Sequence, residues 1–154
     1  SGLDGRIDAI VDGAVCTVGL ESTIVQLDDG AVLLRPGGVA VEDIEKEIGR
    51  PVSIRPNVEK ITAPGQLNSH YAPQAKLRLN ATEARDDEVM LGFGDVRGDL
   101  TLSRTGDLAE AAARLFDCLH QLDATGRPIA VASVPHTGLG RAINDRLTRA
   151  AAPR

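Results

Sequence analysis

Residues 107–134, DLAEAAARLFDCLHQLDATGRPIAVASV, contain the clearest helix and the clearest strand of this 154-residue chain. The first part has the i, i+3, i+4, i+7 spacing of an amphipathic helix, with apolar residues at Leu108, Ala111, Ala112, Leu115, Phe116, Leu119 and Leu122. Asp107 followed by Glu110 resembles a capping box that begins this helix, and Gly126 is a natural end for it. The continuous apolar run at 129–134 is typical of a strand that is buried on both faces.

The sequence on both sides of this segment continues the alternation of strands and helices. Apolar runs predict strands at 77–79, 89–93 and 100–102, and the spacing of apolar residues from Leu139 to Ala150 predicts a last helix. Fully apolar strands that alternate with helices favour parallel pairing. We therefore expect an α/β fold for residues 76–154, a Rossmann-like domain with a mostly parallel sheet.

Strands predominate in the N-terminal third of the chain. The pattern predicts strands at 7–12, 14–27 and 31–35, and the turn Asp28-Asp29-Gly30 should join the last two in a hairpin. A helix is predicted from Val41 to Ile48. Three strands and one short helix bury too little surface to fold alone. We expect this part to lean on a preceding region that is missing from this chain or on a neighbouring molecule, or to be poorly ordered.

Residues 50–75 have the composition of a linker, with low periodicity and four prolines. The exception is the stretch from Thr62 to Pro73, in which His70 and Tyr71, the only tyrosine, precede Ala-Pro. Such a pair can belong to a functional loop, or Tyr71 can simply pack on a domain surface.

Polar residues interrupt the predicted hairpin where strands usually carry Val or Ile. Ser22 and Thr23 are neighbours, so one hydroxyl can face a cleft while the other anchors the backbone. Arg35 ends the next strand and carries a guanidinium suited to phosphate or carboxylate. Together they can bind an anionic ligand that accepts and donates hydrogen bonds. The alternative is an ordinary hairpin with a solvated edge and an Arg ion pair.

Five segments in combination resemble the two-domain threonylcarbamoyl-AMP synthase family, and they are GLESTIV (19–25), LLRPG (33–37), Pro64-Gly65, HYAP (70–73) and GLGRAINDRL (138–147). The resemblance implies that 1–49 are the C-terminal end of a strand-rich, YrdC-like α/β catalytic domain. It likewise implies that 50–75 are a linker that folds back as a lid and that 76–154 are the C-terminal domain. Family members begin with a long region that contains a Lys-x-Arg motif. This chain lacks that region, so we expect a C-terminal portion that is inactive alone.

The resemblance also implies a reaction, in which L-threonine, bicarbonate and ATP with Mg²⁺ give threonylcarbamoyl-AMP and pyrophosphate for threonylcarbamoyladenosine modification of tRNA. Ser22 matches a hydroxyl that contacts L-threonine, with Thr23 as a supporting neighbour, and Arg35 matches an arginine that contacts the ATP phosphates. His70 or Tyr71 would contact the nucleotide, and both remain candidates. No catalytic residue and no metal ligand is assigned. A departure from the family pattern is Gln26, where an acidic residue is common.

Composition excludes several other classes of protein. The net charge of −5 argues against a dominant nucleic-acid surface. No run approaches the about 18 apolar residues of a membrane span, and no signal peptide opens the chain. Cys16 and Cys118 are far apart and form no CxxC motif, which favours two reduced thiols in a cytoplasmic protein; a single disulfide is the alternative.

Two glycine-rich stretches need interpretation. In Gly92–Gly98 the third glycine comes one position late and a strand follows, which argues against a dinucleotide-binding loop. The stretch 135–140 follows a strand and opens a helix, so the N–H groups of 138–141 could hold an anion. A tight turn that requires glycine explains the same residues and is the favoured interpretation.

Two rival functions remain open. Residues 75–154 could form a non-catalytic regulatory or interaction module, although a single core accounts for the helix stripe and leaves no second apolar face for docking. The resemblance to YrdC-like domains also suggests binding of double-stranded RNA, which the net charge disfavours.

Overall fold

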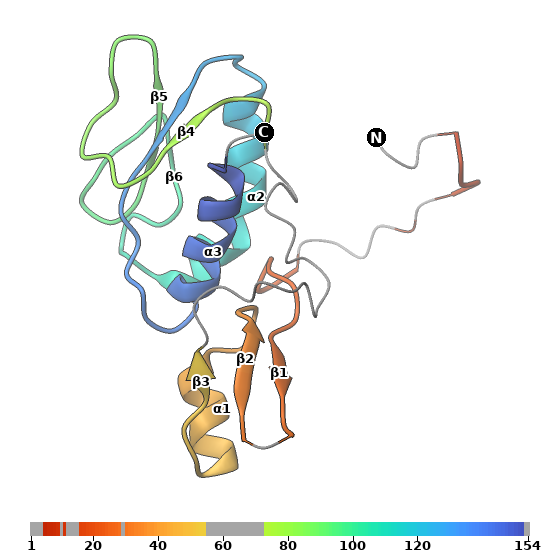
Figure 1. The fold of residues 1–154 in the computed structure, drawn as a ribbon. Helices are drawn as coiled ribbons and strands as arrows, with labels where there is room; N and C mark the ends of the chain where they lie inside the picture. Colours follow the sequence, from red (N-terminus) through yellow and green to blue (C-terminus); the bar gives the residue numbers. More distant parts are fainter. Residues whose placement is uncertain (1–4, 10, 12–15, 29, 55–72, 153–154) are drawn as a thin grey trace.

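The computed structural model describes residues 5–9, 11, 16–28, 30–54 and 73–152 (Figure 1). The elements follow in the order β1 (Ile24–Gln26), β2 (Val32–Arg35), α1 (Val41–Ile48), β3 (Ser53–Ile54), β4 (Leu77–Arg78), β5 (Val89–Gly92), β6 (Leu100–Thr101), α2 (Leu108–Asp123), β7 (Ile129–Val131) and α3 (Gly140–Ala150). In Figure 1 the first four elements form a small N-terminal unit below the larger C-terminal domain.

The C-terminal domain is built on a four-stranded sheet in the order β4-β7-β5-β6. Every neighbouring pair is parallel, with Val89 opposite Ile129 and Leu91 opposite Leu100. Strands β5 and β7 are buried along their whole length, as their continuous apolar sequence requires. The predicted α/β fold with a mostly parallel sheet is confirmed.

Helix α2 supplies much of the core of this domain. It packs on β5 and β6 and against α3. Most of the predicted stripe is buried, with Leu115 fully inaccessible, and Leu108 and Phe116 are half-buried. The Asp107 carboxylate accepts the Glu110 N–H at 2.8 Å, as a cap should. The capping box closes through a third residue. The buried hydroxyl of Ser103 accepts the Asp107 N–H at 3.0 Å and donates to the Glu110 carboxylate at 2.5 Å.

The N-terminal unit contains the predicted hairpin and helix. Strands β1 and β2 pair antiparallel, and α1 spans the predicted residues and ends at Gly49. Its small core consists of four buried side chains from β2 and the residue before it, from α1 and from the segment after the helix, namely Ala31, Leu33, Val41 and Val52. Val25 of β1 is partly buried against them.

Two strand predictions and one linker prediction for this unit need correction. Among the described residues, 7–9 and 11 are in no strand, and the strand expected at 14–27 is reduced to β1. Strands persist where a neighbour satisfies their backbone groups, and among the residues of 7–27 that the structure describes, only Ile24–Gln26 has one. Conversely, Ser53–Ile54 lies in the range predicted as linker and pairs parallel with β2. A two-residue strand carries no period that sequence reading could detect.

A buried carboxylate in the C-terminal domain predicts an acid-sensitive step. Glu88 accepts from Arg78 and from the Arg85 N–H, and these hydrogen bonds lower its pKa from 4.5 to about 2. A depressed carboxyl pKa adds stability above the unfolded pKa, and this stability is lost as the pH falls through the folded pKa. The free energy of unfolding of the wild-type protein, measured with urea, should therefore decrease as the pH falls from about 4.5 to about 2. In Glu88→Gln that part of the loss should disappear, and equal acid sensitivity of both proteins would contradict the assignment.

Candidate functional site

Ser22 and Arg35, which the sequence proposes as partners, lie together across the hairpin. Ile24 is the register partner of Arg35. The guanidinium reaches back to the start of the motif, where its Nη2 and Nε donate to the Ser22 carbonyl at 2.7 and 3.3 Å. Ser22 itself is exposed. The arrangement therefore presents a hydroxyl and a cation at one end of the hairpin.

Thr23 has a structural contact. Its hydroxyl donates to the Val39 carbonyl at 2.6 Å and accepts the Val39 N–H at 3.1 Å. The Thr23 side chain thus fixes the chain that enters α1 against the start of β1. This confirms that one hydroxyl of the pair anchors the backbone, and it leaves Ser22 as the exposed one.

The LLRPG turn is pressed against the same motif. The Gly38 N–H donates to the Glu21 carbonyl at 2.8 Å. At Gly37 the approach is so close that an added Cβ would lie 2.2 Å from the Glu21 carbonyl oxygen. Residues 21–23 and 35–39 therefore form one compact backbone assembly.

Arg146 of α3 also contacts this assembly, and sequence reasoning missed it. It is only 4% exposed, and its Nε and Nη2 donate to the Glu21 carboxylate at 3.0 and 2.8 Å. Nη2 also donates to the Pro36 carbonyl at 3.2 Å, and Nη1 pairs with Asp145. A signal was available, because Arg146 falls on the apolar stripe of the last predicted helix, where an arginine needs a buried partner.

The charge state of Glu21 follows from these contacts. Burial by itself raises the pKa of the Glu21 carboxyl. The hydrogen bond from Arg146, the hydrogen bond from the backbone of Glu21 itself and the charges of Arg146 and Arg35 together outweigh burial, and they leave the pKa below its ordinary value. Glu21 is therefore an ionised partner for two arginines, one from each side of the junction between the unit and the domain.

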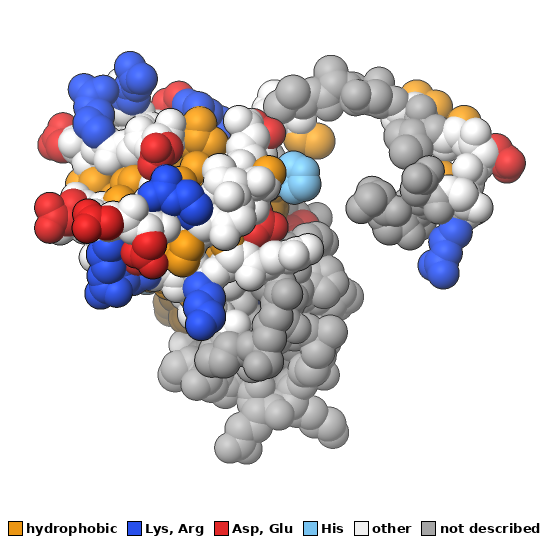
Figure 2. Space-filling model, turned by 90° about the horizontal axis from the view of Figure 1, so that it is seen from above, with side chains coloured by type: hydrophobic (Ala, Val, Ile, Leu, Met, Phe, Trp, Pro, Cys, Tyr) orange, Lys and Arg blue, Asp and Glu red, His pale blue; other side chains and the backbone are white. Residues whose placement is uncertain are grey.

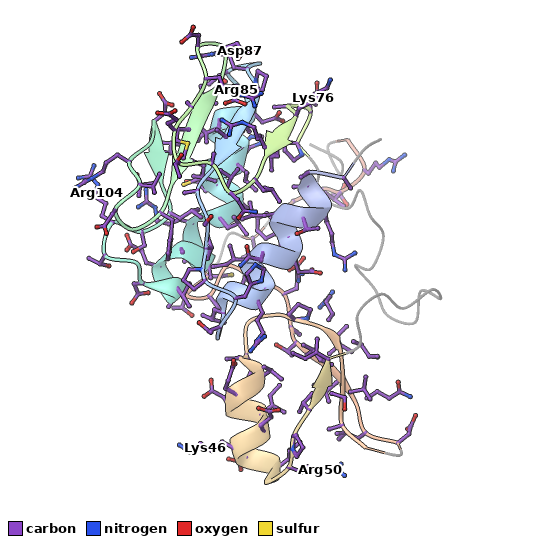
Figure 3. All side chains as sticks on the ribbon, turned by 60° about the vertical axis from the view of Figure 1, so that its left-hand side comes forward. Lys46, Arg50, Lys76, Arg85, Asp87 and Arg104 are labelled. Atoms are coloured by element: carbon purple, nitrogen blue, oxygen red, sulfur yellow. The ribbon has the colours of Figure 1, made fainter. Side chains whose placement is uncertain are left out.

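A second contact between the unit and the domain lies at the start of α3. The Glu42 carboxylate accepts from Arg141 Nη2 at 3.0 Å and from the Gly138 N–H at 3.4 Å. Its own backbone N–H, and then Arg141 and Gly138, lower its pKa. Figure 3 shows the beginning of α1 facing α3, with Lys46 and Arg50 toward the opposite end. The favoured tight turn at 135–140 is confirmed, and the group that lies against the Gly138 N–H is a carboxylate of the same chain.

These contacts correct two expectations. The N-terminal unit leans on the C-terminal domain, which was not among the supports considered. Helix α2 also has a second contact surface, because Leu20 packs against the main core and an added Cβ at Gly19 would lie 2.7 Å from the Ala113 Cα. A cavity of about 650 Å³ lies between this segment and α2, with Phe116 and His120 in its lining.

The structure also describes the glycine-rich stretch at 92–98 and the two cysteines. Added Cβ atoms at Gly92 and Gly98 would lie 2.3 and 2.4 Å from the carbonyl oxygens of Val96 and Met90. These glycines therefore permit close backbone packing, consistent with the argument against a dinucleotide loop. Cys16 and Cys118 are free thiols, as favoured. His70 and Tyr71 lie outside the described residues.

The described residues also show how charge is distributed, which side chains could hold a metal ion and how apolar the helices are. Acidic and basic side chains are interspersed on the face in Figure 2, with no large area of one sign. Within the described ranges, no group of three or more His, Cys, Asp or Glu could hold a metal ion. None of the helices described is long and apolar enough to cross a membrane.

Comparison with known proteins gives a consistent family. The family model "Threonylcarbamoyl-AMP synthase, C-terminal domain" matches residues 39–152. Two curated threonylcarbamoyl-AMP synthases are similar to this chain. The one from Pyrococcus abyssi is 33% identical over 95% of this chain and 50% of its own length, and the one from Bacillus subtilis is 36% identical over 99% and 51%. The chain thus spans about half the length of these relatives.

Solved structures agree with the sequence matches. A crystal structure of Pyrococcus abyssi Sua5 complexed with L-threonine matches with a TM-score of 0.79 and 31% identity, over 97% of this chain and 51% of that one. A structure of the same protein with alanine in place of an adjacent His and Tyr has a TM-score of 0.69 and 29% identity, over 88% and 46%. The chain described here belongs to the threonylcarbamoyl-AMP synthase family.

Proposed function

We propose that this chain is the C-terminal part of an L-threonylcarbamoyladenylate synthase, a nucleotidyltransferase that serves threonylcarbamoyladenosine modification of tRNA. The complete protein would convert L-threonine, bicarbonate and ATP into threonylcarbamoyl-AMP and pyrophosphate. The observation that carries the proposal is the Ser22–Arg35 pair, in which the Arg35 guanidinium donates to the backbone carbonyl of the exposed Ser22, within the motif that resembles the family. A family relative of known structure is complexed with L-threonine, which supports that substrate.

Each site residue has a chemical role in this proposal. Ser22 would hydrogen-bond L-threonine, and Thr23 would support it by holding the backbone to Val39. Arg35 would contact the ATP phosphates and stabilise negative charge as pyrophosphate leaves. His70 or Tyr71 would contact the nucleotide. The Pyrococcus abyssi relative also has an adjacent His–Tyr pair, which is replaced in one of its structures.

Mg²⁺ would enter with ATP, because it is commonly bound through nucleotide phosphates and one or two carboxylates. The described residues do not fit a dedicated magnesium site. They contain no suitable cluster of ligands, and the carboxylate next to Ser22 is held by Arg146. We therefore assign no step of the reaction to residues of this chain acting through the ion.

The proposal assigns 1–49 to the end of the catalytic domain, 50–75 to the linker and 76–154 to the C-terminal domain. Its test is pyrophosphate release from ATP, L-threonine and bicarbonate with Mg²⁺. The chain would be assayed alone and with the N-terminal region of a threonylcarbamoyl-AMP synthase added in trans. Activity only in the mixture is expected. If the mixture releases no pyrophosphate although the added region is folded, the proposal is contradicted. Activity of the chain alone would mean that the site residues are misassigned.

Replacement of Arg35 by alanine should weaken use of ATP more than use of L-threonine. A lost charge-assisted hydrogen bond to phosphate corresponds to a rise in the KM for ATP of about ten- to a hundredfold. The KM for L-threonine should rise by less, because Ser22 remains. Steady-state kinetics of the reconstituted enzyme measures both, with Arg50→Ala at the far end of α1 as the control. Equal losses for the two substrates would overturn the assignment of Arg35.

A further inference from the structure

Arg146 is a C-terminal-domain side chain whose hydrogen bonds reach both halves of the Ser22–Arg35 site. Glu21 immediately precedes Ser22, and Pro36 immediately follows Arg35. A single guanidinium contacts both flanking residues, at 2.8 Å to the Glu21 carboxylate and 3.2 Å to the Pro36 carbonyl. It thereby joins the two strands of the site from outside the hairpin.

The cost of burying this cation indicates what it does. Removing a guanidinium from water is expensive unless partners satisfy it, and a buried ion pair by itself is weak evidence for stability. Asp145 in the same helix already supplies one anionic partner, at 20% side-chain exposure. The remaining donors point out of α3, toward a residue 125 positions earlier and a carbonyl 110 positions earlier in the chain. These hydrogen bonds fix the position of the hairpin relative to α3, and they add little to the stability of α3 itself.

A second ion pair near Arg146 also fixes the position of the N-terminal unit relative to α3. Glu21 is 28% exposed at its side chain, so Arg146 reaches it at the boundary between buried and solvated regions. The Glu42–Arg141 pair holds α1 to the first turn of the same helix α3, five residues before Arg146 in the sequence. Helix α3 is thus attached to the N-terminal unit at both the hairpin and α1.

We propose that Arg146 is a positioning residue for the Ser22–Arg35 site, through which the C-terminal domain sets the geometry of substrate binding. This inference rests on the proposed function of that site. It gives the C-terminal domain a defined part in the reaction. The domain touches neither L-threonine nor ATP through Arg146, and it keeps the Ser22 hydroxyl and the Arg35 guanidinium at a constant separation. A small displacement of substrate-binding groups can cost a large factor in rate.

The first test uses this chain by itself and needs no enzyme activity. Arg146→Gln should accelerate amide hydrogen exchange about tenfold in residues 19–27 and 36–39, because their attachment to α3 is lost. Exchange in β5 and β7 should stay unchanged. The matched control is Arg78→Gln, which breaks another Arg–Glu pair of the C-terminal domain, with Nε and Nη2 both on the Glu88 carboxylate. That control should accelerate exchange around β4 and leave 19–27 as in wild type.

The second test uses the reconstituted enzyme and separates positioning from stability. Arg146→Gln should raise the KM for L-threonine and the KM for ATP about tenfold each. Arg78→Gln should keep both within about twofold at a similar loss of melting temperature. Arg146→Lys should restore the KM for L-threonine more than the KM for ATP. An ammonium can pair with Glu21 but lacks the planar fork that also reaches Pro36.

A third variant guards against simple misfolding of Arg146→Gln. Glu21→Gln removes the partner at a partly exposed position, and its effects on exchange and on the KM values should be non-additive with those of Arg146→Gln. Unchanged exchange at 19–27 in both single variants would overturn the inference. So would additive KM effects, or KM changes in Arg78→Gln equal to those in Arg146→Gln. Failure of wild type to release pyrophosphate would instead refute the proposed function, and the exchange result would still decide whether Arg146 holds the motif.

Discussion

Replacement of Gly37 by alanine is expected to abolish the candidate site, with pyrophosphate release by the reconstituted enzyme falling at least about a hundredfold. The new Cβ would lie 2.2 Å from the Glu21 carbonyl oxygen and 2.5 Å from the Ser22 carbonyl carbon and the Thr23 nitrogen. All three are backbone atoms and cannot rotate away. The two segments must therefore separate, at a cost of about 3 kcal/mol or more. Kinetics with both substrates measures the loss.

The adjacent glycine supplies a matched control. A Cβ at Gly38 would meet the Val18 Cγ1 at 3.0 Å, which is the end of a side chain that can move by a few tenths of an ångström. Its N–H, which donates to the Glu21 carbonyl, is retained in alanine. Gly38→Ala should keep activity within about threefold of wild type. Similar activity of the two alanine variants would mean that the close packing of these segments is not needed for the reaction.

Replacement of Leu115 by alanine should lower the free energy of unfolding of the C-terminal domain by about 2–5 kcal/mol. Leu115 is 0% exposed on the face of α2 that packs on the parallel sheet, so truncation removes buried apolar surface and leaves a cavity. Urea denaturation followed by circular dichroism measures the change, with an unchanged slope of free energy against urea concentration.

The control for this variant is Leu27→Ala, at a leucine that is 58% exposed. It should stay within about 0.5 kcal/mol of wild type. A loss of less than about 1 kcal/mol in Leu115→Ala would contradict the position of this residue in the core. At temperatures well below unfolding, Leu115→Ala should retain the substrate KM values of wild type, because Leu115 lies in the core of the C-terminal domain.

The long periodic segments of this protein were predictable, and the reasons are local. Helix α1 has the predicted bounds, and α2 begins at its predicted cap, because side-chain spacing and capping residues act within one or two turns. The parallel sheet followed from continuous apolar strands between helices. The meeting of Ser22 and Arg35 followed from one short hairpin, whose turn residues stand between two apolar runs.

The failures involve elements whose partners are far away in the chain. The residues between 16 and 23 have the composition of a strand, yet they run along α2, where only glycine fits at position 19. The Ser103 hydroxyl enters the capping box from outside the helix. Strand β3 exists because β2 offers it an edge. None of these contacts leaves a periodic pattern in the sequence, because each depends on the arrangement of separate elements.

The sequence by itself determined the class of fold, the bounds of the main helices and the residues that carry the family motifs. Periodicity, caps and turns act between residues close in the chain, and they can be read one segment at a time. Only the tertiary structure decided how the C-terminal domain contacts the N-terminal unit. Arg146 binds Glu21 and Pro36 beside the site, and Arg141 binds Glu42 of α1. The physical reason is that a buried guanidinium takes its partners from whatever the fold brings within hydrogen-bond distance, and here these partners lie about a hundred residues away.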